Sequence, residues 1–259
     1  MTKRNKQSVR EIKQNNKTKK GKVVAEKFVE ERQRSIIPLK AQNDNQRKAL
    51  KAFTDKQLVI QTGSAGTGKS ELMGWWASKQ WLLGNVDSII ITRPHKHLGE
   101  DYGAVKGNDA EKLLPFCMSI LMKLKKYLGT GILRNNFVLD GFEDLFAEAS
   151  GIQIVPIEKI QGISFNERTI ILADEIQNAT EAQVKSLTTR MEEGCQLLIT
   201  GDPLQTALPF DTNGLSFLEK VVENNPHDDI EIIRYSPEDN CRKGVASHLT
   251  KAYEKLGNW

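Results

Sequence analysis

The stretch Gln61–Met73, QTGSAGTGKSELM, constrains the fold of this chain more than any other. It holds three glycines within six residues, although glycine inside a helix or strand costs about 0.5–1 kcal/mol relative to alanine. The span from Gly63 to Ser70 matches G-x-x-x-x-G-K-[ST], a loop whose backbone N–H groups surround the phosphates of a nucleotide. Such a loop lies between a buried strand and the amino end of a helix. The flanking segments LVIQ and KSELMGWWASKQW have these two patterns.

Further β-rich runs alternate with helical patterns along the chain. The segments SIIIT and TIILA are almost continuously apolar, which is typical of strands buried on both faces of a parallel sheet. Thr180 and Gln183 predict a capping box that opens a helix. The alternation predicts an α/β domain, a mostly parallel sheet flanked by helices, over residues 36–259. The expected strands are Leu58–Gln61, Ser88–Thr92, Ile152–Val155, Thr169–Ala173, Gln196–Thr200 and Ile230–Arg234.

Composition places the chain among soluble globular proteins, with 39% hydrophobic and 27% charged residues. No apolar run approaches the roughly 18 residues of a membrane span, so no membrane partner is expected. Cys117, Cys195 and Cys241 are scattered without metal-ligand spacing, which predicts a reducing, cytoplasmic setting.

Residues 1–35 are expected to form a flexible basic arm that precedes the domain. Positions 1–22 alone carry a net charge of +8, whereas the whole chain carries +4. A basic arm on a mildly acidic body indicates contact with a polyanion such as nucleic acid. A solubilising tail without a partner is an equal alternative.

The glycine loop predicts a site for ATP and Mg²⁺. Lys69 would reach the β- and γ-phosphates, and the hydroxyl of Ser70 would bind Mg²⁺. The helix that follows adds the partial positive charge of its amino end. The expected nucleotide-binding residues of the loop are Gly63, Ser64, Ala65, Gly66, Thr67, Gly68, Lys69 and Ser70.

Two further apolar strands end in polar residues. In TIILADEIQN, Asp174 is expected to hold Mg²⁺ through water, because a carboxylate at the end of a buried strand needs a cation. Glu175 is expected to point away from Asp174, since strand residues alternate sides, and to orient the attacking water. In QLLITGDPLQ, Gln205 follows the strand at the ligand-facing edge of the sheet and is a candidate for the γ-phosphate or that water.

Four ordered segments, GSAGTGKS, LADEIQN, TGDPLQ and EDNCRKGVA, together resemble the PhoH-like family of ATPases. More distantly, they resemble one motor core of superfamily-one helicases. The resemblance covers residues from about Pro38 to Tyr253 and implies a RecA-like P-loop NTPase fold. It also implies ATP hydrolysis coupled to RNA or single-stranded DNA.

The resemblance adds site residues position by position. Gln46 corresponds to a glutamine on the adenine side, with an exposed helix residue as the alternative. Arg93 corresponds to a segment that faces a nucleic-acid backbone, with a strand-end ion pair as the alternative. Arg242 corresponds to an arginine that reaches the γ-phosphate, and Arg190 to one that acts across a subunit boundary. An arginine supplied by a neighbouring copy favours a ring, for which six copies fit the family.

Other aromatic and histidine residues are interpreted as structural. Trp75, Trp76 and Trp81 are expected in the core or an interface rather than stacked on bases. His95 and His97 are expected on a surface loop rather than at a metal.

Two other functions remain open at this stage. One is a nucleotide-stabilised nucleic-acid-binding assembly module with little turnover. The other is a P-loop phosphotransferase, against which the neighbouring carboxylates of Asp174 and Glu175 argue.

Overall fold

The computed structural model describes residues 36–94, 109–139, 150–206 and 213–256. The chain divides into two units, Met1–Pro38 and Leu39–Trp259. The first unit contributes only its last three residues to the described part, so the predicted basic arm lies outside it. All helices and strands described below belong to the second unit.

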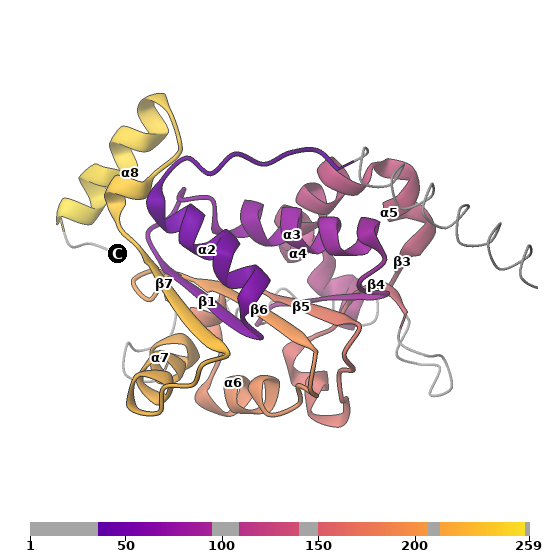
Figure 1. Cartoon of the computed structure of the whole chain (residues 1–259). Coiled ribbons are helices and arrows are strands. Elements are labelled where there is room, and N and C mark those ends of the chain that lie inside the picture. Colours follow the sequence, from indigo (N-terminus) through magenta and orange to yellow (C-terminus); the bar gives the residue numbers. More distant parts are fainter. Residues whose placement is uncertain (1–35, 95–108, 140–149, 207–212, 257–259) are drawn as a thin grey trace, which may run out of the picture. The chain divides into compact units, whose positions relative to one another are not determined.

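A single sheet of seven strands forms the centre of this unit (Figure 1). Its order is β3-β4-β2-β5-β6-β1-β7, and every pair is parallel. The six predicted strands are confirmed, and β3 is an additional two-residue strand. The strands are β1 (Leu58–Gly63), β2 (Ser88–Thr92), β3 (Phe137–Val138), β4 (Gly151–Ile154), β5 (Thr169–Ala173), β6 (Gln196–Gly201) and β7 (Ile230–Tyr235).

Helices cover both faces of the sheet (Figure 1). One face carries α2 (Asp44–Asp55), α3 (Lys69–Leu83), α4 (Asp109–Leu128) and α5 (Thr130–Asn136), and the other carries α6 (Glu181–Thr188) and α7 (Gly214–Asn224). The last helix, α8 (Gly244–Leu256), follows β7 at the edge of the sheet. Short 3₁₀ helices are η1 (Ile157–Gly162), η2 (Ile176–Asn178) and η4 (Pro237–Asp239).

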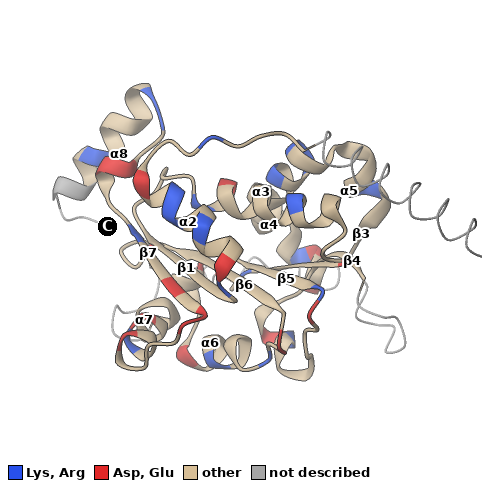
Figure 2. Cartoon of the chain, in the orientation of Figure 1, with Lys and Arg blue, Asp and Glu red and all other residues tan. Residues whose placement is uncertain are grey.

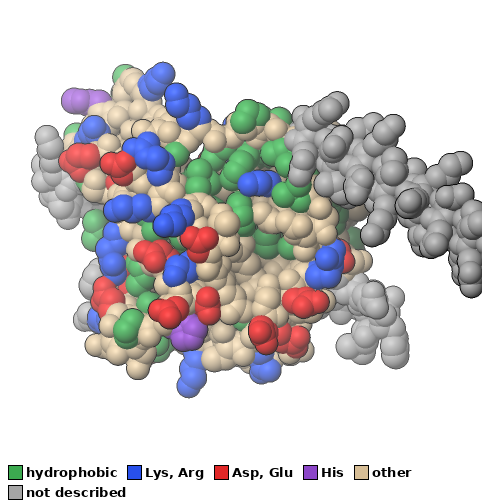
Figure 3. Space-filling model, in the orientation of Figure 1, with side chains coloured by type: hydrophobic (Ala, Val, Ile, Leu, Met, Phe, Trp, Pro, Cys, Tyr) green, Lys and Arg blue, Asp and Glu red, His purple; other side chains and the backbone are tan. Residues whose placement is uncertain are grey.

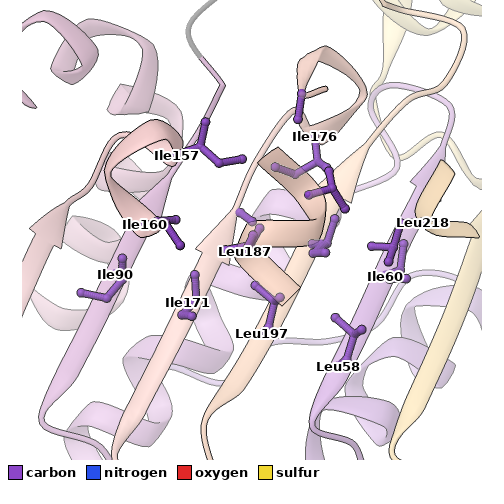
Figure 4. Packing of buried hydrophobic residues seen from close by; sticks show 14 of the residues in the cluster. Leu58, Ile60, Ile90, Ile157, Ile160, Ile171, Ile176, Leu187, Leu197 and Leu218 are labelled. Carbon is purple, nitrogen blue, oxygen red and sulfur yellow. The ribbon is translucent and has the colours of Figure 1, made fainter. Parts of the chain in front are cut away.

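Burial of the strands explains the continuous apolar runs. All five residues of β2 and all five of β5 are buried, as expected when helices cover both faces of a parallel sheet. Between the sheet and α6, aliphatic side chains from β1, β2, β5 and β6 meet Ile157, Ile160 and Leu187 (Figure 4). The predicted capping box of Thr180 and Gln183 is present and opens α6.

Charged residues belong mainly to helices, loops and strand ends (Figure 2). On the face shown in Figure 3, hydrophobic side chains gather around α3 and charged side chains of both signs surround them. Within α3, Trp76 is 7% exposed and its Nε1 donates to Oε1 of Gln196 at 2.6 Å, so the predicted core position of this tryptophan is confirmed.

The last helix of the chain carries partly exposed apolar side chains. The pattern of Val245, Leu249 and Tyr253 predicts an amphipathic helix, and α8 is present. These three side chains are 73%, 42% and 46% exposed.

Candidate nucleotide-binding site

The glycine loop joins the end of β1 to the start of α3, as the sequence predicts. Gly63, Gly66 and Gly68 have φ angles of 109°, 76° and 88°, which side-chain-bearing residues rarely adopt. A Cβ on Gly63 would lie 2.0 Å from the carbonyl oxygen of Tyr235 in β7. The loop therefore requires glycine here, both for its conformation and for its close approach to the neighbouring strand.

Lys69 folds back over the loop from the first turn of α3. Its Nζ donates to the carbonyl oxygens of Gly63 and Ser64, the latter at 2.7 Å. The same ammonium group lies 5.8 Å from the ring centroid of Tyr235. The N–H groups at the start of α3 have no partner within the helix, so the ammonium and these donors together form a setting suited to phosphate oxygens.

Asp174 and Ser70 provide hard oxygen atoms beside the loop. Ser70 Oγ lies 3.4 Å from Oδ1 of Asp174, and Thr200 Oγ1 donates to the same carboxylate oxygen. Burial and the charge of Glu175 raise the pKa of Asp174, while hydrogen bonds from Thr200 and Ser70 oppose the rise. A buried carboxylate next to a hydroxyl fits Mg²⁺, which binds proteins through one or two carboxylates and takes its other ligands from phosphates and water. In the described ranges, no group of three or more His, Cys, Asp or Glu residues forms a separate metal cluster.

Glu175 has an unusual backbone conformation. Its φ of 59° makes it the one positive-φ residue other than glycine among those described. The strand ends at Ala173, so Glu175 opens η2 rather than continuing β5. Strand alternation therefore does not apply at Glu175, and the charge of Glu175 raises the pKa of Asp174. Residues held in sparsely populated conformations cluster at functional sites.

Gln177 is a site residue that the sequence analysis missed. Its side chain is fully buried, and its Nε2 donates to Oε2 of Glu175 at 2.6 Å and to the carbonyl of Gln205 at 3.2 Å. Its Oε1 accepts the backbone N–H of Asp202 at 3.1 Å. Gln177 thus connects the candidate catalytic carboxylate to the segment after β6. The only available signal was its place in the LADEIQN motif.

Gln205 lies in the segment that Gln177 contacts. Its own Nε2 donates to Oδ2 of Asp202 at 2.7 Å. Its predicted contact with the γ-phosphate or the attacking water stays a prediction, and the structure places it at the correct edge of the sheet for that role.

Gln46 lies beneath the glycine loop and is only 4% exposed, so the alternative of an exposed helix residue was wrong. Its Nε2 donates to the carbonyl of Thr67 at 2.8 Å and to Sγ of Cys241 at 3.2 Å. The residues that follow η4 also contact the loop, because the N–H of Cys241 donates to the carbonyl of Gly66 at 2.9 Å.

The three arginines occupy different places. Arg242 lies against the loop, since a Cβ on Gly66 would come within 2.9 Å of its Cδ. Arg190 follows α6 and precedes β6, which puts it at the opposite edge of the sheet from the loop. Arg93 donates to the carbonyl of Phe116 in α4 at 2.8 Å, and its positive charge acts to lower the pKa of Asp174.

The fold and this site define the class of the protein. A wholly parallel sheet with a glycine loop after its first strand, and a carboxylate after the strand two places away, is the RecA-like P-loop NTPase arrangement. The large terminase of a thermophilic bacteriophage shares this fold, with a TM-score of 0.50 and 16% identity over 82% of this chain and 50% of the terminase.

The family follows from the sequence comparisons. The model of the PhoH-like protein family matches residues 38–254, and the chain belongs to this family. It is 32% identical to Protein PhoH of Escherichia coli K12 over 85% of this chain and 59% of that protein. It is also 32% identical to the PhoH-like protein of Bacillus subtilis over 81% of this chain and 62% of that protein. The chain thus spans about three-fifths of the length of these curated relatives.

Proposed function

We propose that this chain hydrolyses ATP in a Mg²⁺-dependent reaction. The observation that supports this most strongly is the convergence of Lys69, Ser70 and Asp174 at one edge of the sheet, with Ser70 Oγ 3.4 Å from Asp174 Oδ1. Lys69 and Ser70 are the first two residues of α3, whereas Asp174 follows β5 and is 104 positions from Ser70 in the sequence. Membership of the PhoH-like family and the P-loop NTPase fold support the same reaction class.

Each residue has a defined task in the proposed reaction. Lys69 and the N–H groups of the loop bind the phosphates, and Ser70 and Asp174 hold the cation. Bound Mg²⁺ would neutralise charge that develops on the phosphate oxygens. Glu175, held by Gln177, orients a water molecule for in-line attack and accepts its proton. Arg242 lies close enough to the loop to act within its own chain.

The hydrolysis is proposed to be coupled to RNA or single-stranded DNA in a cytoplasmic setting. The basic composition of residues 1–22 supports contact with a polyanion. The hydrogen bonds from Gln177 to Glu175 and Gln205 support coupling of nucleic-acid binding to hydrolysis, because a shift of the segment after β6 would move the catalytic carboxylate. In the parts of the chain that the structure describes, no helix is long and apolar enough to cross a membrane.

We propose that the chain forms a ring of six copies, in which Arg190 of one copy acts on the nucleotide bound by its neighbour. Arg190 lies at the edge of the sheet away from its own loop, so it can approach a phosphate only in a neighbouring copy. An arginine supplied in this way accelerates phosphoryl transfer in other P-loop NTPases.

The test is steady-state phosphate release from Mg·ATP, with and without single-stranded RNA or DNA. We expect turnover that rises with one nucleic acid and is lost in Glu175→Gln. Glu193→Gln is the matched control, because Glu193 is exposed and lies near the opposite edge of the sheet. Deleting residues 1–22 should weaken nucleic-acid binding and flatten its salt dependence.

The alternatives predict different results. Tight nucleotide binding with no phosphate release under any condition would indicate an assembly module instead. Transfer of the phosphate to an acceptor, rather than its release to water, would indicate a phosphotransferase.

A further inference from the structure

Three consecutive carbonyl groups of the glycine loop accept hydrogen bonds from other parts of the chain. The carbonyl of Thr67 accepts from Nε2 of Gln46 at 2.8 Å. The carbonyl of Gly66 accepts from the N–H of Cys241 at 2.9 Å, and that of Ala65 from Nδ2 of Asn240 at 3.4 Å. We call these donors, from Gln46 in α2 and from residues 240–241 after η4, the loop brace.

The loop brace determines which way the loop presents its N–H groups. In a planar trans peptide the C=O and the following N–H point in opposite directions. Because the brace holds three carbonyls outward, the N–H groups of residues 66–68 point the other way. Successive N–H groups directed to one side form a concavity for anions, so the brace prepares the loop for phosphates.

Both amide hydrogens of Gln46 are committed to this task. A glutamine side chain has two N–H donors, and those of Gln46 go to the Thr67 carbonyl and to Cys241 Sγ, the latter at 3.2 Å. Its Oε1 accepts the N–H of Gln42 at 2.8 Å. The fit against the loop is close, since a Cβ on Gly68 would lie 2.7 Å from Nε2 of Gln46. No amide hydrogen of Gln46 remains for a base.

We infer that Gln46 is a positioning residue that holds the glycine loop in its triphosphate-binding shape together with Cys241, and that Gln46 does not read the adenine base. The inference rests on the proposed nucleotide binding. It gives Cys241 a defined role, as the acceptor that fixes the orientation of the Gln46 amide. It also predicts that any difference in affinity between ATP and GTP does not depend on Gln46.

The test compares ligands that share phosphates but differ in the base. Binding of Mg·ATP, Mg·GTP and Mg·tripolyphosphate is measured by calorimetry for the wild type and for Gln46→Met, which keeps the side-chain length without hydrogen bonds. We expect affinity to fall about five- to tenfold for all three ligands, as for the loss of a hydrogen bond or two. Gln57→Met is the matched control, because Gln57 donates instead to Glu192 at the opposite edge of the sheet.

A loss confined to Mg·ATP, with tripolyphosphate binding unchanged, would overturn the inference and make Gln46 a base reader. Unchanged binding of all three ligands would overturn it as well. Cys241→Ala, which removes one acceptor, should give a smaller loss that is again equal for the three ligands, and Cys241→Ser should restore binding. If Gln46→Met does not fold, the two Cys241 variants provide the test instead.

Failure of the proposed hydrolysis is a separate result. A chain that binds Mg·ATP without releasing phosphate leaves this comparison intact, because only binding is measured. A wild-type chain that binds none of the three ligands overturns both the inference and the proposed function.

Discussion

Alanine at two glycines of the same loop should have very different effects on stability. A Cβ on Gly63 would lie 2.0 Å from the carbonyl oxygen of Tyr235, a backbone atom of the neighbouring strand β7. A Cβ on Gly66 would meet only the side chain of Arg242, at 2.9 Å from Cδ. Both residues have positive φ, at 109° and 76°, so the conformational penalty is similar and the surroundings make the difference.

The magnitudes follow from these contacts. A left-handed backbone costs a non-glycine residue about 1–2 kcal/mol at either position. At Gly63 the strands β1 and β7 must also move apart to relieve the clash of the new Cβ with the Tyr235 carbonyl. Such overpacking adds about 1–3 kcal/mol. At Gly66 the flexible arginine side chain can move aside at little cost. We therefore expect the free energy of unfolding to fall about 2 kcal/mol further for Gly63→Ala than for Gly66→Ala.

The assay is urea unfolding of the nucleotide-free protein, followed by tryptophan fluorescence. Gly131→Ala is the control, because Gly131 lies in α5, does not need a positive φ, and has no other part of the described chain within 4 Å of its Cβ position apart from its neighbours and the backbone of its own helix. This change should be neutral or stabilising by up to about 1 kcal/mol. Equal destabilisation by Gly63→Ala and Gly66→Ala would refute the reasoning, because the clash of the new Cβ with the Tyr235 carbonyl would then add nothing to the loss of stability.

Three further predictions concern charged groups. Asp174→Asn should stabilise the nucleotide-free protein at neutral pH, because burial raises the pKa of the carboxyl and wild-type stability therefore falls as pH rises from its ordinary pKa towards the raised one. Urea unfolding between pH 5 and 8 checks this, and a less stable variant would contradict it. Burial acts to raise the pKa of Glu71, but hydrogen bonds from Lys123, Lys126 and Tyr127 outweigh it and lower the pKa to about 2. Glu71→Gln should therefore lower the free energy of unfolding by about 1 kcal/mol at pH 7, and in the same assay this loss should shrink as pH falls below 4.5. A loss of stability that is the same at every pH would contradict this prediction. If Arg190 acts across subunits, mixing inactive Lys69→Ala with inactive Arg190→Ala should restore part of the phosphate release, and no recovery would exclude that role.

Much of the fold could be predicted because its signals are local. Strands buried on both faces must be apolar throughout, and β2 and β5 are. The glycine loop and the capping box of α6 consist of residues close together in sequence. By contrast, β3 has only two residues, too few for any pattern, and exists because it pairs with β4.

The details of the site depended on contacts between distant residues. Gln46 and Cys241 are 195 positions apart, and no sequence period connects them. The alternation rule failed at Glu175 because the strand ends two residues earlier and the chain turns into a left-handed conformation. Gln177 was missed for the same reason, since its partners Gln205 and Asp202 follow a different strand.

The central claim is that Glu175 activates water for attack on ATP bound by the glycine loop. The most direct measurement is a single-turnover experiment with protein in excess over Mg·ATP, in which bound ATP and ADP are quantified over time. The wild type should convert bound ATP to ADP, and Glu175→Gln should bind ATP with similar affinity and retain it unhydrolysed. If Glu175→Gln converts bound ATP at the wild-type rate, Glu175 is not the catalytic group and the proposed mechanism is wrong.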